Sequence, residues 1–300
     1  MSTASIETAQ KIKAIGREIL PAVMPSQAIY AGQHETEPYA GVRVTRDAQY
    51  GPHERNRLDV FAAEGATGKR PIFIFVHGGG FVMGDKRSHP DSPYLDNVAL
   101  WAARHGLVGI NITYRLAPEF KFPSGAGDLG AAVAWSREHA AEFGGDPERI
   151  FVMGTSAGAV HVADFLAQPQ FAEAHAGVKG AILLSGIYDT THGGAPPAPA
   201  YYGEDASKHA AMSSLPGLIE SPIPILFVLT EFDPEPFERQ MLKVLQSWTE
   251  RHGAWPPFVR LMGHNHLTST FHLNTQDDYL GAQMLAFMAR ASQTGMVRAS

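Results

Sequence analysis

Short apolar runs alternate along this chain with stretches whose apolar residues recur at helical spacing. The clearest run is residues 71–77, PIFIFVH, where every position from Ile72 to Val76 is apolar, as in a strand that is covered on both faces. Similar runs occupy residues 57–61, 107–113, 149–153, 178–184, 223–230 and 257–261. Strands separated by helical segments are typical of a mostly parallel sheet with helices on both faces, the α/β class.

The segments between these runs carry the pattern of amphipathic helices. Residues 128–143 and 157–166 have apolar positions spaced three and four apart, so we expect a helix in each, and a final helix at 277–291. Residues 1–20 alternate polar and apolar positions as an amphipathic helix does. None of these patterns repeats at a fixed period.

Two segments lie outside this rhythm and are expected to form a small lid. We place an N-terminal lid or cap at residues 1–45 and the catalytic domain at residues 46–300, and expect removal of the N-terminal segment to change substrate range more than fold. An insertion around residues 190–220 begins with the stretch GGAPPAPA at 193–200 and is too long for an ordinary connection between a helix and a strand. A plain surface loop is the alternative for the insertion.

Composition narrows the range of partners. Of the 300 residues 44% are hydrophobic and 18% charged, which is typical of a folded globular protein. A net charge of −6 offers no basic surface for nucleic acid or an anionic membrane, so a neutral or apolar small molecule is the expected partner. With no cysteine the chain has no disulfide and no thiolate ligand or nucleophile. The start is not typical of a signal peptide and no run is long enough to span a bilayer, so a cytoplasmic location is expected.

The first chemical motif is the pentapeptide GTSAG at residues 154–158. It follows the apolar run RIFVM and precedes a helical segment, which is the context of a nucleophile elbow that presents Ser156 at a sharp turn. The dipole at the start of the following helix would favour negative charge developing there. The alternative is a glycine-rich turn in which Ser156 only caps a helix.

The second motif is HGGGF at residues 77–81, at the end of the strand 71–77. Backbone N–H groups reach an oxyanion only where no side chain obstructs them, so Gly79 and Gly80 are candidates for an oxyanion hole together with Ala157. His77 is expected to organise this loop. A phosphate-binding loop is the competing interpretation, but the chain has neither GK[ST] nor GxGxxG after a first strand.

A nucleophilic serine needs a histidine base and a carboxylate that orients it. Asp233 follows the run 223–230 and is the candidate acid, with Glu231 as its rival. His266 follows the last strand and is the candidate base, with His264 as the alternative. The order Ser156, Asp233, His266 is that of the α/β hydrolases. His264 and His266 could also suggest a metal site, but no third ligand is evident nearby in the sequence, and no metal is expected.

With these motifs the chain resembles the hormone-sensitive-lipase family of carboxylesterases. The resemblance rests on HGGGF, YRLAPE at 114–119, FPSGAGD at 122–128, GTSAG and the downstream Asp and His, and it covers about two-thirds of the chain. It implies the α/β-hydrolase fold, oxyanion donors at Gly79, Gly80 and Ala157, and a serine carboxylesterase without metal or organic cofactor. EFDPEPF and GHNHL depart from the family pattern and resemble kynurenine-formamidase-like and feruloyl-esterase-like sequences. An arylformamidase or other amidase is therefore the alternative activity, and a non-catalytic ligand-binding protein the alternative class.

YRLAPE and FPSGAGD are expected to be architectural rather than catalytic. Asp128 is a candidate N-cap for the helix that follows it. Arg115 and Glu119 are a candidate buried ion pair.

Overall fold

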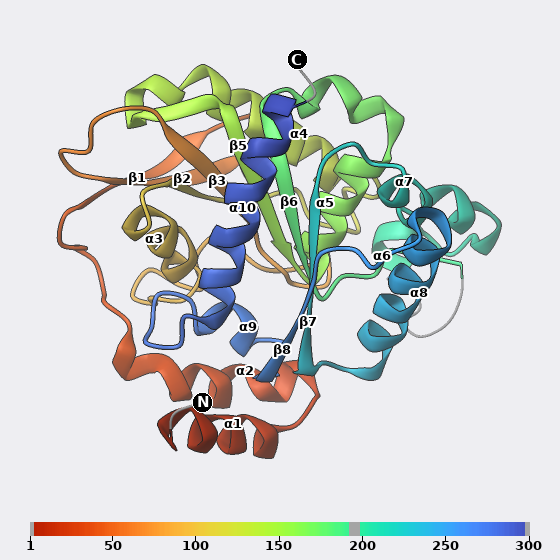
Figure 1. The fold of residues 1–300 in the computed structure, drawn as a ribbon, viewed down its shortest axis with the longest axis horizontal. Helices are drawn as coiled ribbons and strands as arrows, with labels where there is room; N and C mark the ends of the chain where they lie inside the picture. Colours follow the sequence, from red (N-terminus) through yellow and green to blue (C-terminus); the bar gives the residue numbers. More distant parts are fainter. Residues whose placement is uncertain (1–2, 192–198, 298–300) are drawn as a thin grey trace.

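An eight-stranded sheet runs through the centre of the molecule (Figure 1). The computed structural model describes residues 3–191 and 199–297, so part of the expected insertion, residues 192–198, lies outside the described residues. The strands are β1 (Val42–Gln49), β2 (Arg57–Ala63), β3 (Arg70–Val76), β4 (Val108–Ile112), β5 (Gly145–Thr155), β6 (Val178–Leu184), β7 (Ile225–Phe232) and β8 (Phe258–Asn265). Their order is β1-β2-β4-β3-β5-β6-β7-β8. β2 runs antiparallel to both β1 and β4, and the other neighbouring strands pair in parallel, so the predicted mostly parallel sheet is confirmed.

Each of the seven predicted runs is a strand, and the sheet also contains a strand that the sequence analysis does not predict. β1 is an edge strand whose burial follows no clean alternation, with only Val42 fully buried. The boundary drawn between residues 45 and 46 falls inside β1, so the part of the chain that precedes the sheet ends at residue 41.

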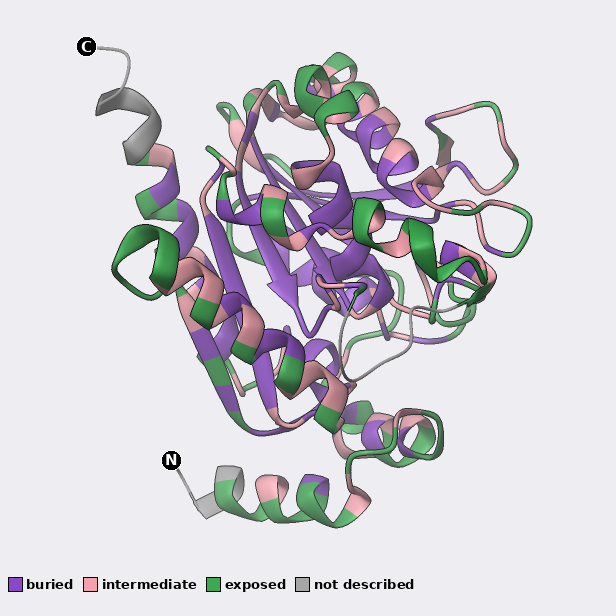
Figure 2. Ribbon diagram, turned by 90° about the vertical axis from the view of Figure 1, so that its right-hand side faces the viewer, coloured by how far each residue is buried: buried purple, intermediate pink, exposed green. Residues whose placement is uncertain are grey.

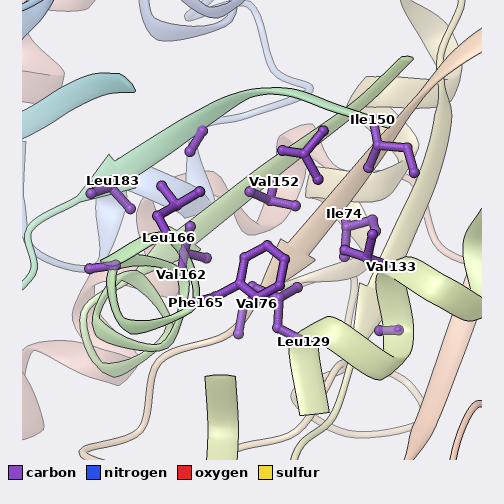
Figure 3. Packing of buried hydrophobic residues seen from close by; sticks show 14 of the residues in the cluster. Ile74, Val76, Leu129, Val133, Ile150, Val152, Val162, Phe165, Leu166 and Leu183 are labelled. Atoms are coloured by element: carbon purple, nitrogen blue, oxygen red, sulfur yellow. The ribbon is translucent and has the colours of Figure 1, made fainter. Parts of the chain in front are cut away.

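Helices cover both faces of the sheet. On one face lie α4 (Ser124–Glu138), α5 (Ala157–Ala167) and α8 (Glu235–His252), and on the other lie α3 (Asp96–Arg104) and α10 (Tyr279–Val297). Figure 3 shows the first face, where Ile74 and Val76 of β3 and Val152 of β5 pack with Val133 and Phe165 from the helices. The central strands are buried along almost their whole length (Figure 2), as runs that are apolar at every position require.

The remaining helical segments are short or lie at the ends of the chain. The α-helices are α1 (Thr3–Ile15), α2 (Ile19–Tyr30), α6 (Pro199–Tyr202), α7 (Leu215–Ile219) and α9 (Thr268–Phe271), and the 3-10 segments are Ala31–Gln33, Ala140–Phe143, Pro169–His175 and Ala206–Met212. In Figure 1, α1 and α2 lie together at one end of the molecule, beside β8 and α9. Within residues 3–191 and 199–297, no helix combines the length and the apolar character that crossing a membrane requires.

Two expectations about the segment before α4 are wrong. The helix begins at Ser124, directly after Pro123, so Asp128 lies inside it and cannot be its N-cap. Its carboxylate instead accepts hydrogen bonds from the backbone N–H and the Nε of Arg115, at 2.8 and 2.9 Å. Glu119 is exposed, so the partner of Arg115 is Asp128 rather than Glu119.

Candidate active site

Ser156 lies at the sharp turn between β5 and α5. Its φ and ψ are 54° and −122°, a conformation that non-glycine residues seldom adopt and that is found in strained turns at functional sites. The turn is tight: a Cβ at Gly158 would lie 2.1 Å from the carbonyl oxygen of Val76, and one at Gly154 would lie 2.2 Å from the carbonyl oxygen of Gly158. The glycines of GTSAG are therefore required by close backbone approach, as in a nucleophile elbow.

Asp233 follows β7 and is fully buried. Its Oδ1 lies 2.6 Å from Nδ1 of His266, while its Oδ2 accepts hydrogen bonds from the Ser185 hydroxyl at 2.6 Å and the Thr230 N–H at 2.7 Å. Glu231, the rival acid, points elsewhere and accepts a hydrogen bond from the N–H of Gly263 at 2.7 Å. The structure thus pairs His266 with Asp233 and not with Glu231.

The charge state of Asp233 follows from these contacts. Burial alone would raise its pKa, but the hydrogen bond and the positive charge of His266, together with the donors Ser185 and Thr230, outweigh burial and hold the pKa below its ordinary value. An ionised carboxylate accepts the Nδ1 proton of His266, which leaves Nε2 as the nitrogen with a free lone pair. Among the described residues Nε2 has no hydrogen-bond partner.

The HGGGF loop brings its glycines to the same place. Gly79 has φ of +134°, and a Cβ there would lie 2.0 Å from the carbonyl oxygen of Met83. Ala157 is the first residue of α5, so its N–H has no acceptor within the helix. Gly79, Gly80 and Ala157 all line the cavity that Ser156 lines, which brings together the three predicted oxyanion donors and the serine.

His77 packs beneath the HGGGF loop through its ring and its Nδ1 atom. Its ring stacks on Tyr114 at 4.4 Å between centroids, and Nδ1 lies 2.6 Å from the carbonyl oxygen of Gly78. Burial lowers the pKa of His77 to about 4, so the ring is neutral at physiological pH. His77 does not line the cavity, in agreement with the expectation that it organises the loop.

Ser156 and His266 line one cavity of about 560 Å³, a size in the usual range for small-molecule sites. Its walls are mainly apolar: Ile19, Leu20, Val23, Phe81, Val82, Met83, Leu95, Val160, Ile187, Tyr202, Phe237, Leu267 and Phe271. No Asp, Glu, Lys or Arg is among the described lining residues. Besides His266, the polar side chains of the lining are hydroxyls and one amide, those of Gln27, Ser88, Thr155, Ser156 and Thr270.

Two residues that contact Asp233 are absent from the sequence analysis. Ser185 follows β6, and its hydroxyl donates to the carboxylate, as described above. Arg17, in the N-terminal segment, donates to the backbone carbonyl of Asp233 at 2.9 Å. The sheet order would have suggested Ser185, because β6 and β7 are neighbours and their carboxyl ends meet at one edge. No sequence signal points to Arg17.

His264 is directed away from this cavity. Its Nε2 lies 3.1 Å from Oδ2 of Asp277, and its ring lies beside that of His272. In the sequence, no third metal ligand is evident near His264 and His266. The structure separates these two histidines and groups His264 with His272 and Asp277 instead.

A sequence model of the alpha/beta hydrolase fold matches residues 73–217. In structure the chain resembles esterase B from Lactobacillus rhamnosis, with a TM-score of 0.73 over 99% of both chains at 15% identity. The chain has the α/β-hydrolase fold. The likeness to esterase B shows this fold and not the activity of the chain.

Two curated relatives of this chain come from Mycobacterium tuberculosis. The probable carboxylic ester hydrolase LipM is 34% identical over 158 residues, which are 48% of this chain and 35% of LipM. The carboxylesterase NlhH is 41% identical over 88 residues, which are 29% of this chain and 26% of NlhH. The matched part of the chain thus spans only about a third, or less, of the length of these relatives.

Proposed function

We propose that this α/β hydrolase is a serine carboxylesterase that cleaves small to medium neutral esters through an acyl-enzyme intermediate. Ser156 is the nucleophile, His266 the general base and acid, and Asp233 the carboxylate that orients His266. The backbone N–H groups of Gly79, Gly80 and Ala157 form the oxyanion hole. The observation that carries the proposal is the buried contact of 2.6 Å between His266 and Asp233, which leaves Nε2 of His266 without a partner in the cavity that Ser156 lines.

The first half of the reaction forms the acyl-enzyme. Oγ of Ser156 attacks the ester carbonyl carbon while its proton passes to Nε2 of His266, and the carbonyl oxygen becomes an oxyanion bound by the three N–H groups. The intermediate collapses, the bond to the alcohol oxygen breaks, and that oxygen takes the proton from Nε2. Throughout, the Asp233 carboxylate stabilises the imidazolium. Each oxyanion donor is expected to contribute about 10²–10³ in kcat.

The second half hydrolyses the acyl-enzyme by the same proton transfers in reverse. A water molecule loses a proton to Nε2 of His266 and attacks the acyl carbon, and the oxyanion hole again holds the negative oxygen. Collapse of this second intermediate breaks the bond to Ser156 Oγ, which regains its proton, and releases the carboxylic acid. No residue beyond those already named is needed for either half.

The character of the cavity supports a neutral, largely apolar substrate. A charged substrate group would lose its hydration without a compensating charge among the described lining residues. The relatives LipM and NlhH, a probable carboxylic ester hydrolase and a carboxylesterase, support ester hydrolysis over amide hydrolysis.

We further propose that residues 1–45 and the insertion around 190–220 act as the lid of this cavity. From the first segment, Ile19, Leu20 and Val23 of α2 form part of the wall. From the second, Tyr202 lines the cavity and is buried against Phe81. Because these side chains define the space around Ser156, they are expected to set which acyl and alcohol groups enter.

The test of the proposed function combines covalent labelling with a substrate panel. A fluorophosphonate probe should label the wild-type protein and not Ser156→Ala, and that variant should lose several orders of magnitude in turnover of p-nitrophenyl esters while keeping its melting temperature. The panel also contains N-formyl aryl amines. Absence of labelling would indicate a ligand-binding protein, and faster cleavage of the formamides than of the esters would indicate an amidase.

A further inference from the structure

A second group of ionisable side chains lies at the end of β8, outside the cavity that Ser156 lines. It consists of His264 in β8, His272 directly after α9, and Asp277 in the turn before α10, and we call it the His264 cluster. One ligand atom of each residue lies within 4.8 Å of the corresponding atoms of the other two. The rings of His264 and His272 are 4.4 Å apart between centroids. None of these residues lines the cavity that contains Ser156.

His272 has the orientation that metal-binding histidines adopt. The residue is fully buried, and its Nδ1 lies 2.7 Å from the carbonyl oxygen of Thr268, an atom that can only accept. Nδ1 therefore carries the proton, and Nε2 presents a bare lone pair that has no partner among the described residues. A buried acceptor without a donor is unfavourable. Histidines that bind metals commonly donate their other ring N–H to a backbone carbonyl in this way.

The contact between His264 and Asp277 has the spacing of two ligands on one ion. Nε2 of His264 lies 3.1 Å from Oδ2 of Asp277. Two atoms that are each about 2.0–2.2 Å from a zinc ion stand about 2.8–3.6 Å apart at octahedral or tetrahedral angles. The pair can therefore bind one ion with little movement, and Nε2 of His272 is the third donor.

An ion has a route to these side chains from solvent. A second cavity of about 480 Å³ lies between α1 and β8 and is lined by His264 and Asp277, with Ala9 and Ile12 of α1 on the opposite wall. The side chain of Asp277 is 32% exposed. Arg260 also lines this cavity, and its guanidinium approaches Glu238 at 4.0 Å, which offsets part of its charge.

We propose that the His264 cluster binds a divalent first-row transition ion, with Zn²⁺ as the occupant that its donors favour. Two imidazole nitrogens and one carboxylate oxygen suit zinc and its neighbours in the series, whereas Mg²⁺ and Ca²⁺ prefer oxygen ligands alone. Three protein ligands leave a position for water. The inference concerns binding alone and does not depend on the proposed esterase activity.

Such an ion would fix the segment that carries His266. It would join the end of β8, the end of α9 and the turn before α10, and His266 lies in the chain between the first two of these ligands. The role that follows is structural, because cross-linking these three segments stabilises the folded state over the unfolded chain.

The test uses untagged full-length protein that has been stripped with a chelator and dialysed. Titration with ZnCl₂ in a calorimeter should show one ion bound per chain, and Zn²⁺ should raise the melting temperature. Asp277→Asn, which keeps the size of the side chain and removes its charge, should weaken zinc affinity at least tenfold and reduce the thermal shift at the same zinc concentration. The matched control is Asp278→Asn, the neighbouring exposed carboxylate, which should bind zinc as the wild type does.

A second variant, His264→Asn, keeps the proposal testable if Asp277→Asn does not fold, as judged by circular dichroism. It should weaken zinc affinity at least as much. The proposal is overturned if the wild type binds no zinc, or if the wild type and the folded variants bind it with equal affinity. Either result would mean that His264, His272 and Asp277 form a hydrogen-bonded group without an ion.

Discussion

His266 and His264 provide the sharpest comparison in the molecule, because they lie two residues apart and contact different carboxylates. Nδ1 of His266 is 2.6 Å from the buried Asp233, and Nε2 of His264 is 3.1 Å from the partly exposed Asp277. If His266 is the base, His266→Ala should lower kcat by about 10⁶, the loss seen when the histidine of a serine triad is removed. At 1.36 kcal/mol per tenfold, this corresponds to about 8 kcal/mol of transition-state stabilisation.

His266→Ala also leaves Asp233 as a buried charge without its partner, which costs about 3–5 kcal/mol of stability. His266→Gln avoids most of this cost, because its amide can donate to Asp233 while accepting no proton from Ser156. It should fold and be as inactive as His266→Ala.

The comparison variant is His264→Ala, which removes a hydrogen bond to a carboxylate worth about 1.5–3 kcal/mol of stability. It should keep kcat within about tenfold of the wild type, because His264 does not line the cavity that contains Ser156. The assay is steady-state hydrolysis of p-nitrophenyl butyrate, with thermal melts on each variant. Near-normal turnover by a folded His266→Gln protein, or a greater loss in His264→Ala, would refute the assignment.

Three further predictions follow from the cavity and from one buried carboxyl. Soluble short-chain esters should be cleaved faster than emulsified long-chain triglycerides, since the cavity of about 560 Å³ has the volume of a site for a drug-sized molecule. Faster cleavage of triglycerides would contradict this. Leu20→Trp should raise KM for bulky esters more than for p-nitrophenyl acetate, because Leu20 lines the cavity. The control is Met24→Trp: Met24 is as exposed as Leu20 and also lies on α2, but it does not line the cavity, so both KM values should be unchanged. Burial raises the pKa of the Asp164 carboxyl well above its ordinary value. The unfolded chain therefore loses the carboxyl proton at a lower pH than the folded protein does, and the free energy of unfolding falls as pH rises above the ordinary pKa of aspartate. Asp164→Asn should therefore raise the melting temperature at pH 8 more than at pH 5, and an equal effect at both would refute the argument.

The sequence predicts best those strands of the fold that are covered on both faces along their length. Strands β3 and β6 are apolar at nearly every position because both faces are covered, and this pattern identifies them directly. β1 is an edge strand without regular alternation, so its pattern is weak. α3 is missed because it is short: it spans only Asp96–Arg104, fewer residues than the roughly 11–18 over which helical periodicity is recognised.

The residues of the candidate site likewise differ in how far the sequence alone identifies them. Ser156, Asp233 and His266 each follow a strand, and their motifs and order make them recognisable before the sheet order is known. Ser185 carries no motif, and its role depends on β6 and β7 being neighbours. The His264 cluster depends on the turn at α9, which reverses the chain and returns His272 to His264. The sequence contains these residues but no pattern that pairs them.

The N-terminal segment has a larger part in the structure than a detachable lid would have. Arg17 donates to the backbone carbonyl of Asp233 at 2.9 Å, and the Ser26 hydroxyl accepts from the side-chain amide of Asn265 at 3.0 Å. Asn265 in turn accepts from the backbone N–H groups of Leu267 and Thr268 and so shapes the loop that presents His266. Removing the segment would leave these buried groups without hydrogen-bond partners. We expect Asp233 and His266 to shift as a result. The expectation that its removal changes substrate range more than fold therefore does not agree with these contacts, and substitution of single wall residues is the appropriate test of a lid.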